Sequence, residues 1–95
     1  MKTADIIKID KSQLHAINFR RADVLPNREE RASRNRELRR SMSLGNLYKV
    51  PVRIQFENNR KERMETEATV WAVTEKNVSL KSGVTIPIHA IANIS

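Results

Sequence analysis

Apolar and polar residues alternate in the second half of the chain, and this pattern predicts a series of short strands. In the segment 50–57, VPVRIQFE, every second residue is apolar, and Arg53, Gln55 and Glu57 separate the apolar residues after Pro51. A period of two is typical of a strand with one buried face. Because proline cannot donate a hydrogen bond to a neighbouring strand, we expect Pro51 at the start or the edge of this strand.

Four more strands are predicted between this segment and the end of the chain. β-Branched and aromatic residues such as Thr69, Val70 and Trp71 favour a long second strand, and Asn58-Asn59 suits the tight turn before it. The predicted strands are 63–75, 78–81, 84–88 and 91–94, with turns at 75–77 and 82–83 and a break at 89–90.

The fold class predicted from these elements is mainly β with one helix. Five short strands joined by tight turns favour a small five-stranded antiparallel barrel of the SH3-like or Sm-like type, preceded by an Arg-rich helix. The long second strand would bend to take part in both halves of the barrel, and closure would remove exposed strand edges. A flat meander covered by the helix is the alternative.

The segment 27–45 is expected to form the Arg-rich helix. Asn27 is a good N-cap, and Glu30 follows three residues later, as in a capping box. Gly45 and Asn46 are typical of a helix C-terminus. Glu30 and Arg34 have the spacing of a favourable i, i+4 ion pair.

The apolar stripe of this helix is thin. We expect the helix to dock through Leu38, Met42 and Leu44, or to stand away from the body partly exposed. The preceding segment 1–26 has mixed character. Its expected elements are an added strand carrying Ile6, Ile7 and Ile9, a turn capped by Ser12 that carries Leu14 and Ile17, and a helical spacing of Phe19, Ala22 and Leu25.

The length and composition predict one small basic domain. It consists of a mixed N-terminal segment (1–26), the Arg-rich helix (27–45) and the small barrel (48–95). The 95 residues include 18 Lys and Arg against 11 Asp and Glu, which gives a net charge of +7. Without a long apolar run or a signal-peptide pattern, we expect a cytoplasmic protein that does not act at a membrane. The absence of Cys and the presence of only two Gly exclude thiolate chemistry and a glycine-rich phosphate loop.

Arginine is concentrated between residues 20 and 40, where eight Arg stand against four acidic residues. Arginine pairs with phosphate through a planar fork and stacks on bases. On the helix, Arg28, Arg36, Arg39 and Arg40 fall within about 120° of one another. The candidate nucleic-acid-binding residues are Arg20, Arg21, Arg28, Arg31, Arg36, Arg39, Arg40 and Arg53. The alternatives are a solvated helix with internal ion pairs and a surface for an acidic protein.

Other residues carry little chemistry of their own. His15 and His89 stand far apart with no carboxylate at ligand spacing, so we expect no metal site and no cofactor. No nucleophile–base motif is present, so we expect no enzyme. Three interpretations of Trp71 remain open: packing against the N-terminal segments, a stacking platform for bases, and a subunit contact.

The segment 78–94, VSLKSGVTIPIHAIANI, resembles the closing half of an Sm-like barrel, the family that includes the bacterial RNA chaperone Hfq. The positions that carry the resemblance are Leu80, Gly83, Ile86, His89, Ala90 and Ile91. It implies a barrel with His89 at a turn. Pro87 and Ile88 replace the aromatic and basic residues that help form the RNA pocket of that family. Other SH3-like barrels, including the WYL ligand-binding domain, fit the same pattern, and the whole chain resembles short bacterial proteins of unassigned activity.

These observations favour a non-catalytic binding module. Its expected partner is nucleic acid, RNA in preference to DNA, held through phosphate contacts with little base readout. The alternative is a protein-interaction or self-assembly module, a homo-oligomer in the second case, that pairs strand edges near 84–88 and 91–94 between subunits.

Overall fold

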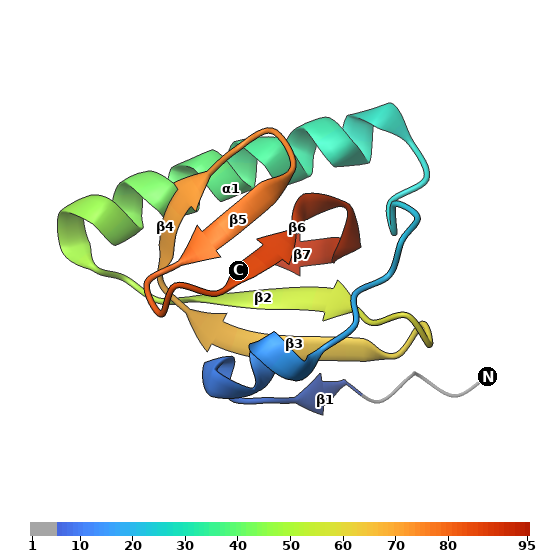
Figure 1. Ribbon diagram of the computed structural model, residues 1–95. Helices are drawn as coiled ribbons and strands as arrows, with labels where there is room; N and C mark the ends of the chain where they lie inside the picture. Colours follow the sequence, from blue (N-terminus) through green and yellow to red (C-terminus); the bar gives the residue numbers. More distant parts are fainter. Residues whose placement is uncertain (1–5) are drawn as a thin grey trace.

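The computed structural model describes residues 6–95 and arranges them as two sheets with one long helix, α1 (Arg28–Tyr48), lying along them (Figure 1). The strands are β1 (Ile7–Lys8), β2 (Val52–Glu57), β3 (Arg63–Ala68), β4 (Val70–Val73), β5 (Asn77–Leu80), β6 (Thr85–Pro87) and β7 (Ile91–Ile94). One sheet has the order β1-β3-β2-β7 and the other has the order β4-β5-β6. Neighbouring strands are antiparallel except for β1 and β3.

β2 forms where the alternating pattern predicted it, directly after Pro51. Val52, Ile54 and Phe56 are buried, whereas Arg53 between them is exposed. β2 pairs with β3 along its whole length, and Ile54 lies opposite Thr66. The period-two prediction is therefore confirmed, and it identifies the face of β2 that contributes to the core.

The long second strand is divided between the two sheets at Thr69. β3 pairs with β2 as far as Ala68, and β4 pairs with β5 from Val70 onward. The carbonyl of Thr69 accepts a hydrogen bond from the Lys81 N–H at 3.0 Å. The prediction that this segment takes part in both halves of the fold is confirmed, but the single strand predicted over 63–75 is wrong because the segment forms two strands.

The predicted closed, five-stranded barrel is wrong. The described residues form seven strands in two sheets, and β1, β7, β4 and β6 are edge strands. After β6 a short 3-10 helix, η2 (Ile88–Ala90), leads the chain out of the three-stranded sheet. β7 then pairs with β2 in the other sheet. The predicted break at His89-Ala90 is confirmed, and η2 is the element that forms there.

α1 begins where the sequence predicted. The Asn27 side chain accepts a hydrogen bond from the Glu30 N–H at 2.8 Å, and its amide donates to the Glu30 carboxylate at 2.5 Å. Because Glu30 contacts Asn27, the expected Glu30–Arg34 ion pair is wrong. Arg34 instead pairs with Asp23, which lies outside the helix.

α1 ends later than predicted, at Tyr48, and Lys49 caps it in the left-handed conformation with φ 55°. The expected stop at Gly45 and Asn46 is wrong because Gly45 serves packing. A Cβ atom at Gly45 would lie 2.3 Å from the Val70 carbonyl oxygen. Glycine therefore allows the helix to approach the backbone of β4 directly.

The docked face of α1 is more polar than its apolar pattern indicated. Leu38 is fully buried as predicted, and Met42 and Leu44 are half-buried. The helix residues that are buried are Arg34, Leu38, Ser41 and Gly45. Their spacing places them on one side of the helix, against β4 and β7.

The N-terminal residues add one strand and one turn to the four-stranded sheet. β1 runs parallel to β3, with Ile7 opposite Met64, so the predicted added strand is confirmed. A 3-10 helix, η1 (Lys11–Ala16), follows and buries Leu14. Asp10 caps η1, so the prediction that Ser12 is the cap is wrong.

Residues 17–27 form an irregular segment, here called the strap, at the right-hand side of Figure 1. Phe19 in the strap bridges to Asn58, so the expected helical structure before Pro26 is wrong. The strap is bonded to the end of β2 and to η2. The Arg20 N–H donates to the Glu57 carbonyl at 3.1 Å, and the Val24 N–H donates to the His89 carbonyl at 2.9 Å.

One core cluster joins these elements. It includes Leu14 from η1 and Leu38 from α1 as well as buried residues of both sheets. The Phe19 ring packs against the buried Phe56 ring, with 5.4 Å between centroids. The strap and the helix are therefore anchored to the same core as the strands.

Candidate nucleic-acid interface

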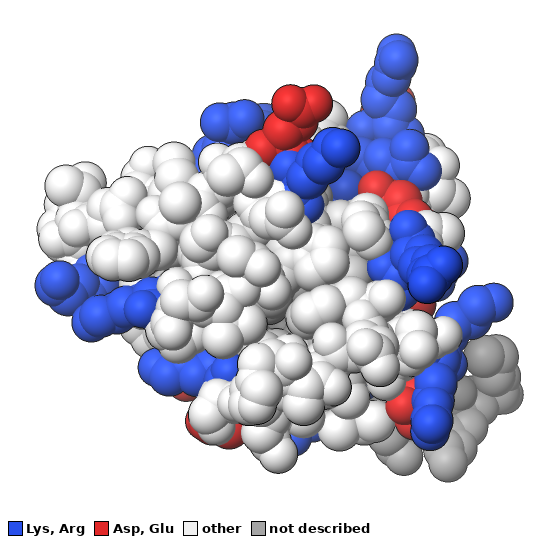
Figure 2. Space-filling view, viewed as in Figure 1, with Lys and Arg blue, Asp and Glu red and all other residues white. Residues whose placement is uncertain are grey.

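Four of the predicted arginines lie together on the side of α1 that points away from the sheets. α1 packs through one side, so residues about half a turn away project into solvent. Figure 2 shows Lys and Arg side chains projecting from the N-terminal part of α1, whereas the surface over β4, β5 and β6 is mostly uncharged. All four arginines are exposed. We call them the arginine face: Arg28, Arg36, Arg39 and Arg40.

The arginine face is largely free of ion pairs. Arg28, Arg36 and Arg39 make no ion pair with any of residues 6–95. Arg40 lies 4.0 Å from Glu37, and both side chains are well exposed. An exposed pair at this distance contributes less than about 1 kcal/mol. The guanidinium groups of this face therefore remain available for a bidentate contact with phosphate.

Arg20 has a structural contact that the sequence did not reveal. Its Nη1 donates to Glu57 Oε1 at 2.6 Å, and Arg63 Nη2 donates to the other oxygen of Glu57 at 3.1 Å. Burial alone would raise the pKa of Glu57, but the hydrogen bonds from Arg20 and Arg63 outweigh it and lower that pKa. Arg20 therefore ties the strap to the end of β2 and is only partly available to a ligand.

Arg31 and Arg34 both contact Asp23 of the strap. Arg34 Nη1 and Nη2 donate to the two carboxylate oxygens of Asp23 at 2.9 and 3.0 Å, and Nη1 also donates to the Ile91 carbonyl at 3.0 Å. Arg31 Nε donates to the Leu25 carbonyl at 2.9 Å and lies 3.5 Å from Asp23 Oδ2. This cluster joins the strap, α1 and β7.

Asp23 is ionised within this cluster over the usual pH range. Its partial burial would raise the pKa, but hydrogen bonds from Arg34 and from the Leu25 N–H outweigh that effect. The nearby charges of Arg34 and Arg31 act in the same direction, so the pKa of Asp23 lies below its ordinary value. Arg34 was not among the predicted binding residues, and only 5% of its side chain is exposed.

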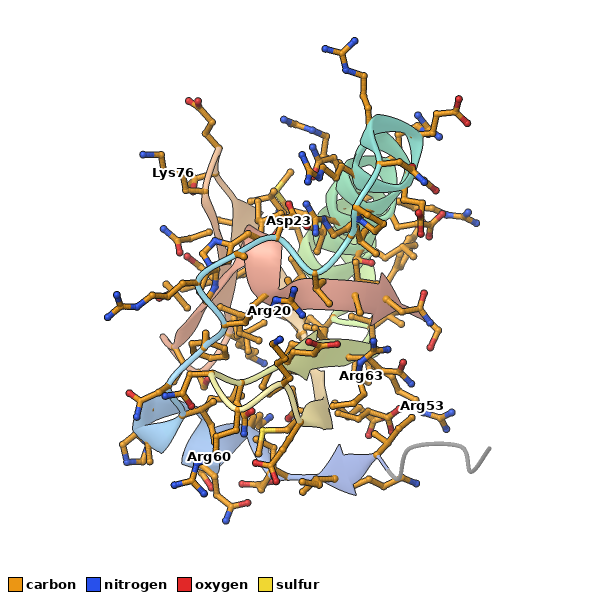
Figure 3. All side chains as sticks on the ribbon, turned by 90° about the vertical axis from the view of Figure 1, so that its right-hand side faces the viewer. Arg20, Asp23, Arg53, Arg60, Arg63 and Lys76 are labelled. Carbon is orange, nitrogen blue, oxygen red and sulfur yellow. The ribbon has the colours of Figure 1, made fainter. Side chains whose placement is uncertain are left out.

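Arg21 and Arg53 are exposed but stand apart from the arginine face. Arg21 belongs to the strap, and Arg53 belongs to β2, where it lies opposite Glu67. In Figure 3, Arg53 lies on the four-stranded sheet, well below α1. The structure therefore does not bring all eight predicted residues into one surface.

Two exposed cations on the end of the molecule seen in Figure 3 were not predicted as site residues. Arg60 lies in the turn between β2 and β3, and Lys76 lies in the turn between β4 and β5. Lys76 is a lone positive charge in its turn, and Arg60 stands in a short run with Lys61 that acidic residues flank, so no sequence pattern singled out either residue. Arg20 and Arg63 on the same end share the carboxylate of Glu57, so Arg60 and Lys76 are the labelled cations there that make no ion pair among residues 6–95.

His89 serves the packing of the strap. Its Nε2 lies 2.5 Å from the carbonyl oxygen of Arg20. Because a carbonyl only accepts, Nε2 must carry a proton. His89 thus makes a hydrogen bond from η2, at the turn before the last strand. Within residues 6–95 no cluster of three metal-ligating side chains occurs, and no helix there is long and apolar enough to cross a membrane.

Trp71 is exposed, with 58% of its surface accessible. It lies where the pairing of β4 with β5 shifts register between Val70 and Ala72. Such a bulge turns a side chain out of the regular alternation. The interpretation that Trp71 packs against the N-terminal segments is therefore wrong, and its roles as a stacking platform or a subunit contact stay predictions.

Comparison of the chain with protein-family models, with curated proteins and with solved structures finds no match.

Proposed function

We propose that the protein is a non-catalytic, cytoplasmic module that binds RNA in preference to DNA through arginine–phosphate contacts. The observation that carries this proposal is the arginine face. Arg28, Arg36 and Arg39 are exposed, lie on one side of a helix that is docked through its opposite side, and have no ion-pair partner among residues 6–95. The resemblance of residues 78–94 to Sm-like barrels favours RNA.

The dimensions of the arginine face suit a nucleic-acid backbone. From Arg28 to Arg40 the helix rises about 18 Å, which is long enough to follow several phosphates of one strand. Glu29 and Glu37 lie near these arginines and reduce the local charge without cancelling it. Contacts of this kind position a strand and carry no sequence information, so binding should tolerate many sequences.

The test is binding of a labelled mixed-sequence single-stranded RNA from about 50 to 200 mM salt. The variant Arg36→Gln/Arg39→Gln/Arg40→Gln removes three charges from the arginine face. The matched control, Lys11→Gln/Arg60→Gln/Lys81→Gln, removes three charges from exposed positions elsewhere. We expect the first variant to flatten the slope of log K against log salt by about 2, since each phosphate contact contributes about 0.7.

Two results would contradict the proposal. The first is no binding of the unmodified protein at the lowest salt. The second is an equal loss of affinity in both triple variants, which would show that only net charge matters. Competition with duplex DNA tests the preference for RNA, and equal competition would remove that part of the proposal.

A second candidate function is self-assembly through strand edges, and one observation favours it. β6 and β7 are both edge strands, one in each sheet. Each edge also carries a feature that limits pairing. Pro87 in β6 has no N–H to donate, and the Ile91 carbonyl of β7 already accepts a hydrogen bond from Arg34.

Light scattering coupled to size-exclusion chromatography tests self-assembly. A defined oligomer that persists in high salt and ignores added RNA would favour assembly over nucleic-acid binding. A Thr85→Pro variant removes a further donor from β6 and should then reduce the molar mass to that of the monomer. A monomer at all protein concentrations would remove this candidate.

A further inference from the structure

A cleft of about 600 Å³ lies between α1, the strap, the β4–β5 turn and η2. Its walls include Arg31 and Asn35 from α1, Lys76 from the β4–β5 turn with Asn77 at the start of β5, and Ile88 and His89 from η2. Figure 3 shows Lys76 and Asp23, which belong to different walls, on the same end of the molecule. The volume is within the range of small-molecule sites in proteins.

The walls of this cleft are bonded to one another. The Ile88 N–H donates to the Lys76 carbonyl at 2.9 Å, which fixes η2 to the β4–β5 turn. The strap is fixed to η2 by the hydrogen bond from the Val24 N–H to the His89 carbonyl, and to α1 by the Asp23–Arg34 pair. A cleft with cross-linked walls is already shaped for a ligand and loses little entropy on binding one.

The charge in the cleft favours an anion. Asp23 is neutralised by Arg34, which leaves Arg31 and Lys76 against Glu75. Arg31 is held through its Nε, and its terminal nitrogens have no hydrogen-bond partner among residues 6–95. Lys76 makes no ion pair with any residue in that range. Arg31 and Lys76 therefore stand on different walls of the cleft, each with terminal nitrogens that no described residue engages, and Lys76 is exposed so that its ammonium can turn toward a ligand.

A buried donor adjoins the cleft without a partner. The Nε atom of Arg34 is buried and has no hydrogen-bond partner in the described part of the chain, although Arg34 itself lines the cleft. Buried donors in folded proteins are nearly always satisfied by protein, water or ligand. Because this Nε atom has almost no exposed surface, Arg34 adds positive charge beside the cleft and does not itself contact a ligand there.

We propose that this cleft binds a small phosphorylated molecule about the size of a nucleoside monophosphate, with Arg31 and Lys76 holding the phosphate. A forked guanidinium and a compact ammonium are the two side-chain types that proteins use for phosphate. Pro87 and Ile88 offer an apolar surface to the organic part, and the amides of Asn35 and Asn77 offer donors and acceptors to its polar edge.

This site is distinct from the arginine face. Arg31 and Asn35 lie on the flank of α1 next to the docked side, Arg36 and Arg40 point away from it, and Arg28 and Arg39 lie between these two pairs. The cleft proposal therefore does not depend on nucleic-acid binding by the arginine face. Substitutions in the arginine face should weaken RNA binding alone, and substitutions in the cleft should weaken binding of the small ligand alone.

The test uses adenosine 5′-monophosphate as the probe, with adenosine and inorganic phosphate as separate arms. Calorimetry measures affinity, and two-dimensional NMR locates the amides that shift. The variant is Lys76→Gln, because no described residue depends on its side chain. The matched control is Lys81→Gln, which removes the same charge from the next turn, outside the cleft.

We expect saturable binding of the nucleotide, with shifts at residues 75–77 and 88–90. Lys76→Gln should weaken it about tenfold, the loss expected for one charge-assisted hydrogen bond, and Lys81→Gln should leave it unchanged. Adenosine alone should bind much more weakly. Shifts confined to the exposed side of α1, equal effects of the two variants, or inorganic phosphate binding as tightly as the nucleotide would each overturn the proposal.

Discussion

The partly buried pair of Asp23 and Arg34 gives the sharpest test of how this fold is held together. Replacing Asp23 by Ala removes both acceptors of the Arg34 guanidinium and leaves the Ile91 carbonyl as its remaining partner. Only 5% of the Arg34 side chain is exposed, so water cannot fully replace the lost carboxylate. Leaving a buried charge unpaired typically costs about 3–5 kcal/mol.

The structure places the expected cost near the lower end of that range. Asp23 is itself 19% exposed, so water can enter the space that its carboxylate leaves. We therefore expect Asp23→Ala to lower the free energy of unfolding by about 3 kcal/mol, out of roughly 5–14 kcal/mol for a domain of this length. With a urea dependence near 1.5 kcal/mol per molar, the midpoint should fall by about 2 M.

Urea unfolding followed by far-ultraviolet circular dichroism is the appropriate assay, because the exposed Trp71 is a poor fluorescence reporter of packing. Glu37→Ala is the control. It removes a carboxylate from an exposed pair on the same helix and should cost less than about 0.5 kcal/mol. Adding Arg34→Met to Asp23→Ala should restore part of the loss, since the unpaired charge is then removed. A loss below about 1 kcal/mol, or a double variant less stable than Asp23→Ala alone, would refute the reasoning.

Three further predictions follow from described contacts. The pKa values of Asp23 and Glu57 are lowered in the fold, so both ionised carboxylates stabilise the folded state above roughly pH 5. The free energy of unfolding should therefore fall as the pH is lowered through the pKa values of the unfolded chain toward those of the fold. Glu57→Gln should make this fall shallower, and an unchanged dependence of stability on pH would contradict the prediction. Gly45→Ala should destabilise by about 2 kcal/mol in thermal unfolding despite alanine's higher helix propensity, because the added Cβ meets the Val70 carbonyl; a stabilised variant would show that the helix can move away. Trp71 should emit as a solvent-exposed indole and be fully quenched by iodide; a blue-shifted, protected emission in the isolated protein would reveal a covered surface.

Much of the strand pattern was predictable because it depends on local sequence. The alternation of Val52, Ile54 and Phe56 and the turn at Gly83 need only neighbouring residues to be recognised. The division of the long strand at Thr69 was not predictable, since β propensity continues through it without interruption. It depends on which strand pairs on each side, and that is settled by contacts distant in sequence.

For α1, the start was predictable from the sequence but the face that packs against the sheets was not. Its start was predictable from Asn27 and Glu30, and its arginine face follows from helix periodicity alone. Its docked face was hidden because Arg34, Ser41 and Gly45 do not count as apolar. Each is buried for its own reason, such as an ion pair for Arg34 and a close backbone approach for Gly45.

The candidate site was also predictable only in part. Which arginines are exposed on α1 could be worked out from spacing, but the partners of Arg20 and Arg34 could not. Arg20 reaches Glu57 across 37 positions, and Arg34 reaches Asp23 across 11. No local pattern identifies such pairs. The sequence-based prediction therefore included arginines, such as Arg20, that are already engaged in an ion pair.

The strap has a consequence for the kinetics of folding. Its contacts join residues far apart in the chain, as in the 69-position separation between Arg20 and His89. The hairpins β2–β3, β4–β5 and β5–β6 close much shorter loops and therefore pay less entropy to form. We expect the strap to dock after the rate-limiting step, so that damage to it speeds unfolding and leaves the folding rate nearly unchanged. The strap would then govern the lifetime of the folded molecule and not the time it takes to fold.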